Sequence, residues 1–496
     1  MAIRRNSIVN LSGSVVGLIL FASLTPLYFN VIGGERYGIL AILWAFLAFF
    51  AAFDFGMGAA LTYLIAREGR AGLAHQADHF WTAMAISLPV GLVTGIGLFG
   101  LVGGGLGNLF HLSPAVHAEM FHSAPSLLAI GICTVLLSTA GGLFQGREFF
   151  VSNALLNTGS LILSILLPVL AALLISPSLD VLILATLAGR VTIVAAAILT
   201  AHFAILERAR PSASQAAARA LIGYGAWSSV GGMIELSISS ADRFILGAVA
   251  GPVAVGYYSV PSSVLARVMV FPTSLGVAAM PQMASRSPEE EIALAGKVVR
   301  MVAMLTPCFV GGIFLAAPFL RLWMGPAFAA MGTVPMEILL PAFWMDSISA
   351  LLFYRLLAQG RPRTIAIIAA LILVPYCLLL YCLAGVWGVS GGAAAFLGRS
   401  AMLFGGRAAA TRSWRMLFKT VGLDLLLLTI ALIACLTSWP AQPPLIVAIL
   451  VTGVSLALTF RRRPPEVDHM VRDALHHLTA RIRRPLATGA GSGLDE

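Results

Sequence analysis

The stretch ELSISSADRFILGAVAGPVAVGYYSVPSSVLARVMVFPTSLG, residues 235–276, decides the fold of this chain because it is long, apolar and yet charged. Its length and apolar content predict two membrane-spanning helices, and the Gly251-Pro252 pair marks the break between them. Each helix also carries polar residues three or four positions apart, which places them on one face. They are Glu235, Ser239 and Asp242 on the first helix and Ser259, Ser263 and Arg267 on the second. Because a charge inside a membrane span is costly, these faces predict a pocket, an ion pair or a functional site.

The composition of the whole chain is that of an integral membrane protein. Of its 496 residues, 59% are hydrophobic and 10% are charged, whereas soluble domains carry about 25% charged residues. The five cysteines lie inside apolar segments without a CxxC pair, so neither a disulfide nor a zinc or other metal site is expected. The net charge of +10 comes mainly from residues between the apolar segments, which argues against nucleic acid as a partner.

Apolar segments divide the chain into about fourteen predicted membrane spans. The spans cover residues 7–31, 38–66, 80–110, 122–146, 150–176, 181–206, 220–249, 253–283, 298–324, 331–358, 363–385, 388–409, 416–438 and 443–460. When alternate connections are assigned to opposite sides, only Arg36 and Arg321 fall on one side and five arginines fall within spans, which leaves 24 of the 31 basic residues on the other side. Because basic residues concentrate in cytoplasmic loops, this split predicts that both termini are cytoplasmic.

A weak internal repeat relates the two halves of the chain. SGSVVG at residues 12–17 resembles WSSVGG at 227–232, and GGERYG at 33–38 occupies the place of AGPVAVG at 250–256. Six spans separate the two copies, which predicts two six-helix lobes related as parallel repeats. The predicted parts are an N-terminal lobe at 1–206, a basic linker at 207–219, a C-terminal lobe at 220–409, two additional spans at 410–460 and a basic tail at 461–496. The tail is predicted to form either an interfacial amphipathic helix at 466–484 or a disordered segment.

Stretches spread over residues 6–410 share the pattern of a known family. They are LTPLYFNVIGGERYGI (24–39), FDFGMGAALTYLIA (53–66), GLFQGREFF (142–150), SADRFILGAVAGPVAVGYYSV (240–260), FPTSLGVAAMPQMA (271–284) and AQGRPR (358–363). In these stretches the chain resembles the polysaccharide transport family of the MOP flippase superfamily. That family includes O-antigen and exopolysaccharide lipid flippases and is related to the MATE exporters.

The resemblance implies an all-α membrane protein of fourteen spans, with two six-helix lobes around a central cavity. It implies a flippase that moves an isoprenoid-diphosphate-linked oligosaccharide from the cytoplasmic to the outer leaflet by alternating access, for lipopolysaccharide or exopolysaccharide biosynthesis. The expected location is the bacterial cytoplasmic (inner) membrane. The expected partners are the lipid-linked glycan, membrane lipids and enzymes of polysaccharide biosynthesis, and neither an enzymatic activity nor a cofactor is expected.

Arginines within the spans are the candidate substrate-binding residues. A lipid diphosphate is anionic, and Arg offers it bidentate hydrogen bonds. The predicted cationic cavity is lined by Arg190, Arg243, Arg267 and Arg399. The alternative is that these arginines form internal ion pairs with Asp54, Glu235, Asp242 and Asp346. Arg355 lies near the end of a predicted span, from which it is expected to extend to the interface, so it is not assigned to the site.

The four carboxylates are candidates either for ion coupling or for charge pairing. Burial favours the protonated form of a carboxyl group, which makes proton carriage feasible, and a sodium gradient is the other option. Glu235 is the first candidate for coupling because it lies centrally on the polar face. Asp54 is the second, with a hydrogen-bonding role in helix packing as the alternative.

Two other functions compete with the flippase. A MATE-like, cation-coupled exporter of small organic molecules has the same architecture, but acids and aromatic residues are expected to dominate its cavity, and here the central charges lean cationic. A membrane glycan polymerase or glycosyltransferase is the remote alternative. Such enzymes usually need a large outer loop or an acidic metal-binding motif, and the longest outer connection, residues 111–121, has no Asp cluster.

Overall fold

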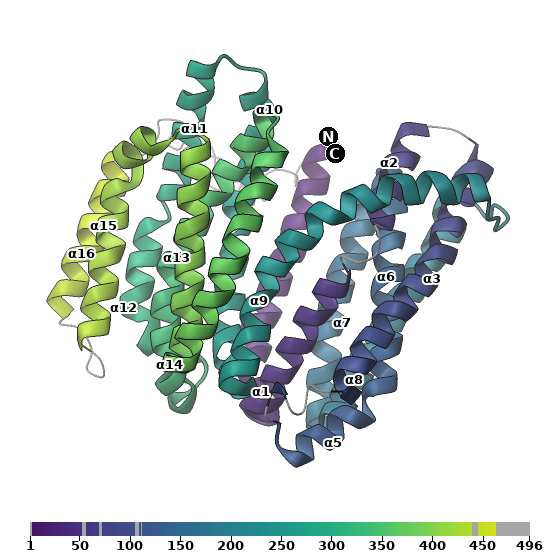
Figure 1. Ribbon diagram of the computed structural model, residues 1–496, viewed down its shortest axis with the longest axis horizontal. Helices are drawn as coiled ribbons and strands as arrows, with labels where there is room; N and C mark the ends of the chain where they lie inside the picture. The colour runs from purple at the N-terminus through teal and green to yellow at the C-terminus, as the bar shows by residue number, and fades with distance from the viewer. Residues whose placement is uncertain are drawn as a thin grey trace, which may run out of the picture. The chain divides into compact units, whose positions relative to one another are not determined.

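The computed structural model of the chain describes residues 2–51, 56–68, 72–104, 109–110, 112–438 and 445–462. Within these residues the regular secondary structure is helical (Figure 1). The helices are α1 (Ala2–Ala51), α2 (Met57–Glu68), α3 (Leu73–Gly104), α5 (Pro114–His122), α6 (Ala124–Gly146), α7 (Phe150–Leu174), α8 (Leu179–Thr200), the π-helical turn η1 (Ala201–Ile205), α9 (Gln215–Val268), α10 (Val270–Ala284), α11 (Pro288–Ala303), α12 (Thr306–Trp323), α13 (Pro326–Ala358), α14 (Pro362–Ala410), α15 (Trp414–Ser438) and α16 (Leu445–Arg462).

Ten helical segments of the described chain are long and apolar enough to cross a membrane. The chain is therefore an all-α, multi-pass membrane protein, which confirms the predicted fold class. Three helices, α1, α9 and α14, bend at a glycine with non-helical dihedral angles: Gly33, Gly251 and Gly388. Each bend lies at the junction of two predicted spans. The count of fourteen spans and the two-lobe repeat stay predictions, and the tail at 463–496 lies outside the described residues.

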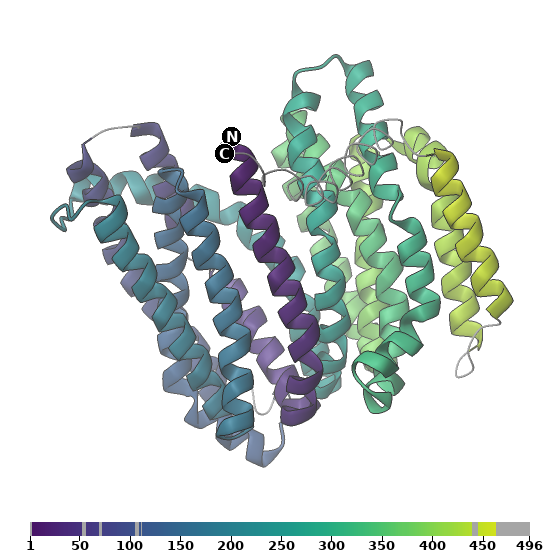
Figure 2. The same ribbon diagram turned by 180° about the vertical axis from the view of Figure 1, so that it is seen from behind.

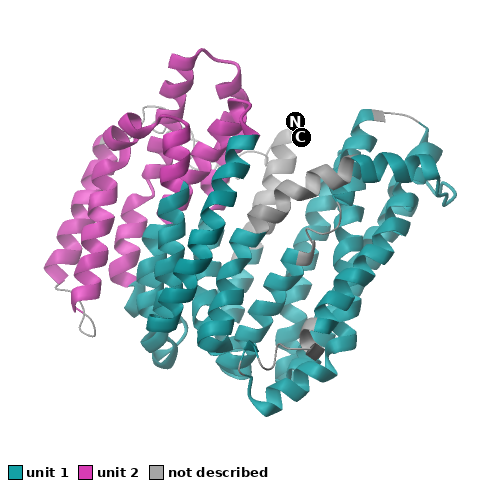
Figure 3. Ribbon diagram, viewed as in Figure 1, with its two compact units in different colours: residues 1–268, 316–342, 363–403 teal, residues 269–315, 343–362, 404–496 magenta. Residues whose placement is uncertain are grey.

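The chain is divided into two compact units (Figure 3). Unit 1 contains residues 1–268, 316–342 and 363–403, and unit 2 contains residues 269–315, 343–362 and 404–496. Helices α12, α13 and α14 contribute residues to both units. The predicted lobes have other boundaries and stay a prediction.

In unit 1, α1 and α9 bend at glycines that have nearly the same backbone conformation. Gly33 has φ 81° and ψ 162°, and Gly251 has φ 82° and ψ 167°. This region of backbone space is essentially restricted to glycine, because a Cβ atom would clash there. The two long apolar helices therefore owe their matching bends to these two residues.

The two bent helices touch each other backbone to backbone. A Cβ atom on Gly38 would lie 1.7 Å from the carbonyl oxygen of Pro252, and a Cβ on Gly256 would lie 2.7 Å from the carbonyl oxygen of Gly34. Real Cβ atoms do not approach other heavy atoms so closely, so the crossing of α1 and α9 requires glycine at both positions. Each of these glycines follows the bend of its own helix by five residues.

The other helices of unit 1 pack around this pair. Helices α3 and α6 lie side by side (Figures 1 and 2) and also meet at small residues, since a Cβ on Gly95 would lie 2.4 Å from the carbonyl oxygen of Leu128. Ser87 and Thr139 share a buried hydrogen bond of 2.6 Å across the same contact. Helices α7 and α8 pack against each other, and α7 also packs against α1.

A carboxylate on the short helix α5 connects the bend of α1 to the start of α8. Nε and Nη2 of Arg36 donate hydrogen bonds of 2.9 and 2.5 Å to Glu119, and the Leu179 N–H donates one of 2.9 Å to the same carboxylate. Glu35 accepts hydrogen bonds from the backbone and hydroxyl of Ser113, the N-cap residue of α5. The bond from Arg36, together with that from Leu179, holds the pKa of Glu119 below its usual range.

Unit 2 contains a buried ion pair that the sequence did not indicate. Arg355 on α13 is 3% exposed and donates bonds of 2.6 and 2.9 Å to the two carboxylate oxygens of Glu291 on α11. It also donates a bond of 2.6 Å to the hydroxyl of Ser413, and Gln359 donates to Glu291. The expectation that Arg355 extends to the interface is therefore wrong, because a carboxylate 64 residues earlier in the chain satisfies its charge inside the protein.

Replacing Gly38 by Ala is expected to destabilise the protein strongly, because the new Cβ would meet the Pro252 carbonyl and force α1 and α9 apart. The loss should lie at or above the upper end of the roughly 1–3 kcal/mol that overpacking costs. Thermal unfolding in detergent measures it, with membrane abundance as a second readout. Gly100→Ala is the matched control, since a Cβ there has no neighbour within 4 Å. Equal behaviour of the two variants would contradict the proposed role of the crossing.

Replacing Glu119 by Gln is expected to lower the melting temperature at neutral pH by removing the carboxylate that Arg36 and Leu179 share. Since the folded pKa of Glu119 is depressed, its contribution is present above the unfolded pKa of about 4.3 and is lost as the pH falls through the folded pKa. The difference in melting temperature between wild type and variant should thus be full near pH 7 and shrink below about pH 4. A difference that does not change with pH would exclude this ion pair as its source.

Candidate functional site

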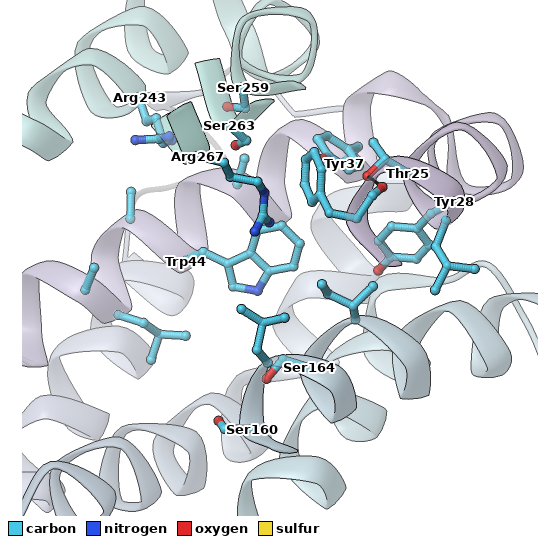
Figure 4. Close-up of a pocket in the computed structure, with 18 of the residues that line it drawn as sticks. Thr25, Tyr28, Tyr37, Trp44, Ser160, Ser164, Arg243, Ser259, Ser263 and Arg267 are labelled. Carbon is cyan, nitrogen blue, oxygen red and sulfur yellow. Dashed lines mark hydrogen bonds between the residues drawn. The ribbon is translucent and has the colours of Figure 1, made fainter. Parts of the chain in front are cut away.

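Unit 1 contains a partly open cavity of about 700 Å³ that is lined by residues of α1, α6, α7, α8 and α9 (Figure 4). This volume lies within the ~300–1,000 Å³ typical of small-ligand pockets. Both arms of α9 reach the cavity, one on each side of the bend at Gly251. The bend therefore brings two polar faces, distant along the helix, to one space.

Three arginines line this cavity. Arg190 comes from α8, Arg243 from the first arm of α9 and Arg267 from the second arm. None of the described residues that line the cavity is an Asp or a Glu. The cavity is therefore cationic over its described surface.

Two of the three arginines have an N–H donor without a hydrogen-bond partner among the described residues. The buried Nε atoms of Arg190 and Arg267 have no hydrogen-bond partner among the described residues. The guanidinium carbon of Arg267 lies 4.4 Å from the centroid of the Phe21 ring, a cation–π contact that holds it in place. Figure 4 shows the Arg267 side chain extending toward Trp44. These side chains therefore present positive charge and unused N–H donors in or beside the cavity.

Arg243 is held by its chain neighbour, Asp242. The Asp242 carboxylate accepts the Arg243 N–H at 2.8 Å and lies 3.5 Å from Nη1 of the same residue. Its other oxygen accepts the hydroxyl of Tyr258 at 2.8 Å. Asp242 is 3% exposed, and it joins the two arms of α9 because Tyr258 lies beyond the bend. The ion pair leaves Arg243 on the cavity wall.

The two polar faces predicted for α9 contribute to the cavity to different extents. On the second arm, the predicted face lines the cavity as a whole. Its members are Ser259, Ser263 and Arg267. On the first arm, the residues at the cavity are Ser239, Ser240 and Arg243. Asp242 is not among the residues that line the cavity, and its carboxylate accepts the hydroxyl of Tyr258 instead.

The remaining predicted site residues lie elsewhere or outside the described side chains. Arg399 on α14 is 8% exposed and lies over the ring of Phe396 at 4.0 Å, and it is not among the residues that line the cavity. Asp346 is half-buried on α13 in unit 2. Asp54 lies outside the described residues, as does the side chain of Glu235. The roles predicted for all these residues in binding or coupling stay predictions.

The structure adds two groups of residues to the cavity. The first is aromatic and comes from α1 on both sides of its bend: Tyr28, Tyr37 and Trp44. The second is polar and comes from α7: Asn157, Ser160 and Ser164. The polar residues of α7 could have been found from the sequence, because they recur at helical spacing within an apolar span. The aromatic residues of α1 could not, because aromatic residues in a membrane helix line packed cores as often as cavities.

The profile of a family described as "Polysaccharide biosynthesis protein" matches residues 3–287. The match covers more than half of the chain. The chain belongs to this family.

A curated relative supports this assignment to the polysaccharide biosynthesis protein family. It is a Shigella flexneri protein named "Putative O-antigen transporter", which is 23% identical over 404 residues that cover 79% of this chain and 94% of the relative.

Solved structures show that this family member has the fold of MOP superfamily transporters. The lipid II flippase MurJ, in an inward closed conformation, matches with a TM-score of 0.66 and 15% identity over 92% of this chain and 98% of MurJ. An inward-facing MATE multidrug transporter matches with a TM-score of 0.63 and 16% identity over 82% of this chain and 98% of its own. A MOP superfamily transporter from Pyrococcus furiosus matches with a TM-score of 0.55 and 16% identity over 85% and 96% of the two chains.

Substitutions at the cavity should separate residues that stabilise the fold from residues that are free to bind a ligand. Asp242→Ala is expected to cost about 2–4 kcal/mol, because it leaves Arg243 and the Tyr258 hydroxyl without their acceptor. Arg267→Met should remain within about 1 kcal/mol of wild type, because it removes a charge that has no ion pair among the described side chains. Melting temperatures in detergent measure both effects, and a comparable loss in the two variants would show that Arg267 is structural.

Proposed function

We propose that the chain is a flippase that carries an isoprenoid-diphosphate-linked oligosaccharide across the membrane by alternating access. The observation that carries the proposal is the cationic cavity of unit 1, in which Arg190, Arg243 and Arg267 share one space and the described lining contains no acid. Family membership, the relative named as an O-antigen transporter and the fold shared with a lipid II flippase support it.

A diphosphate needs such a cavity because its charge cannot enter the hydrocarbon core unaided. Moving even one charge to the bilayer centre costs several kcal/mol or more. Guanidinium groups offset this cost with charge-assisted, bidentate hydrogen bonds to the phosphate oxygens. Since Arg190 and Arg267 have unused donors, anionic cargo is favoured over neutral or cationic cargo.

The location and the partners follow from the same proposal. The protein resides in the bacterial cytoplasmic membrane with both termini in the cytoplasm, as the strong asymmetry of its basic residues favours. It receives the lipid-linked glycan from the glycosyltransferases that build it and delivers it to enzymes acting on the outer leaflet. Reporter fusions at each terminus test the orientation, and an outer location of either one would contradict it.

Coupling to a proton or sodium gradient is part of the proposal, with Glu235 and Asp54 as candidate carriers. Desolvation within a span favours protonation of a carboxyl group, which would let either residue carry a proton with each cycle. Flipping by proteoliposomes with imposed gradients tests this, and a rate that is independent of both gradients would contradict coupling.

Export of small organic cations is the second candidate function, because the fold also matches an inward-facing MATE transporter. An organic cation requires acids or exposed aromatic faces in the binding site. Tyr28, Tyr37 and Trp44 supply aromatic faces, but the three arginines oppose a cation. Increased drug tolerance on overexpression, with normal glycan export in a deletion strain, would favour this candidate over the flippase.

Single replacements of Arg190, Arg243 and Arg267 by Gln are expected to reduce glycan export. A hydrogen bond to a charged group contributes about 1.5–3 kcal/mol, so each replacement should weaken cargo binding roughly tenfold or more. Surface glycan in a complemented deletion strain measures export, and immunoblotting measures membrane abundance.

Arg219→Gln is the matched control, because Arg219 is exposed near the start of the same helix as Arg243 and Arg267. Arg399→Gln tests the remaining arginine that the sequence indicated. Normal export in all three cavity variants would exclude the cationic cavity as the cargo path. If the variants lower the membrane abundance of the protein, and export per molecule stays normal, the arginines serve folding and not cargo binding.

A further inference from the structure

A neutral polar face of α7 lines the same cavity as the arginines. Asn157, Ser160 and Ser164 follow at spacings of three and four residues, which places them on one side of the helix, and all three line the cavity. Helix α7 carries no charged residue along its 25 positions. These three side chains, the α7 polar face, therefore offer hydrogen bonds without charge.

The hydrogen bonds of the α7 polar face are not used within the described part of the chain. A hydroxyl on a helix often bonds the carbonyl four residues earlier. Thr134 on α6, which also lines the cavity, does so and donates to the Ile130 carbonyl at 2.8 Å. Asn157, Ser160 and Ser164 make no such bond to any described residue. Their amide and hydroxyl groups are available to a molecule in the cavity.

Two deeply buried hydroxyls on the cavity wall point independently to a polar ligand. Tyr28 is 6% exposed and Ser259 is 3% exposed, and both line the cavity. Neither hydroxyl oxygen has a hydrogen-bond partner among the described residues. Figure 4 shows the Tyr28 hydroxyl pointing inward. Because an unsatisfied buried hydroxyl is costly, this arrangement fits a cavity that holds a ligand rich in donors and acceptors.

The α7 wall of the cavity contributes neutral polar groups only, whereas the α9 wall carries serines as well as arginines. The arginines come from α8 and α9, whereas the α7 polar face is neutral, and α1 contributes Tyr37 and Trp44. Figure 4 shows Trp44 between Arg267 and the two serines of α7. A glycosyl diphosphate combines the same kinds of group, with charge at one end, hydroxyls at the other and a sugar ring whose C–H surface packs on aromatic faces.

We propose that the α7 polar face binds the sugar attached to the diphosphate and thereby selects which glycan the protein accepts. This inference rests on the proposed flippase function and extends it to the substrate class that one wall recognises. The arginines bind the diphosphate of every candidate cargo, so they do not discriminate among glycans. Neutral groups that pair with sugar hydroxyls do discriminate, because a sugar without the matching hydroxyl leaves them unpaired.

The test compares two triple variants of the full-length protein. The first carries Asn157→Ala, Ser160→Ala and Ser164→Ala. These changes remove the α7 polar face and preserve the helix, because Ala has a high helix propensity. The second is Ser152→Ala, Asn153→Ala and Thr158→Ala, which changes similar residues of α7 that do not line the cavity. A normal melting temperature of each variant in detergent confirms that both fold.

Two probes separate the sugar from the diphosphate. One is farnesyl diphosphate, which has no sugar, and the other is the prenyl-diphosphate-linked glycan extracted from the source cells. Each lost hydrogen bond weakens binding by about threefold to tenfold. The first variant should therefore bind the glycan probe at least tenfold more weakly than wild type and bind farnesyl diphosphate within twofold of wild type. The second variant should match wild type with both probes.

The outcomes distinguish this inference from the function on which it rests. If the first variant binds the glycan probe as wild type does, while Arg267→Gln weakens that binding, the sugar-binding role is overturned. The proposed flippase function is then unaffected. An equal loss for both probes would also overturn it, since the α7 polar face would then act on the diphosphate or on the cavity as a whole. A wild-type protein that binds neither probe would overturn both proposals.

Discussion

The structure of unit 1 depends on one steric constraint, the backbone contact between α1 and α9. A side chain at Gly38 or Gly256 has no room, because the carbonyl oxygens of Pro252 and Gly34 occupy the space. The contact fixes where two bent helices cross, and the bends turn both arms of α9 toward the same cavity. The same bend of α9, together with the hydrogen bond from Tyr258 to Asp242, sets the position of Arg267 on the second arm relative to Arg243 on the first. The geometry of the polar site thus depends on the close packing of small residues between α1 and α9.

Charges in this protein are stabilised in two different ways. In unit 2, Arg355 and Glu291 satisfy each other through paired hydrogen bonds, with Ser413 and Gln359 completing the set. In unit 1, Arg190 and Arg267 keep unsatisfied donors at the cavity. The first arrangement is complete without a ligand and serves the fold. The second leaves part of the cost of charge burial uncompensated by the described residues, which is typical of a binding site.

The sequence predicted the parts of this site that depend on local periodicity. A spacing of four along one helix was enough to place Ser259, Ser263 and Arg267 together. It was not enough on the first arm, where Asp242 and Arg243 are adjacent: Arg243 lines the cavity, whereas Asp242 bonds the distant Tyr258. Contacts between segments far apart in the chain, such as Arg355 with Glu291, carry no local signal. The polar residues of α7 were visible as a pattern, but serines are common in membrane helices for packing reasons alone.

The matching bends of α1 and α9 have a consequence for the gene. A single-nucleotide change in a glycine codon yields Ala, Val, Ser, Cys, Asp, Glu, Arg or Trp, and each of these has a Cβ atom. At Gly33 and Gly251, with φ near +80° and ψ near 165°, every such residue is strained whatever its size or polarity. At Gly38 and Gly256 the neighbouring backbone excludes even Ala. Every missense change at these four codons therefore carries a steric or conformational cost, and random mutagenesis of the gene should recover fewer missense changes there than at Gly100.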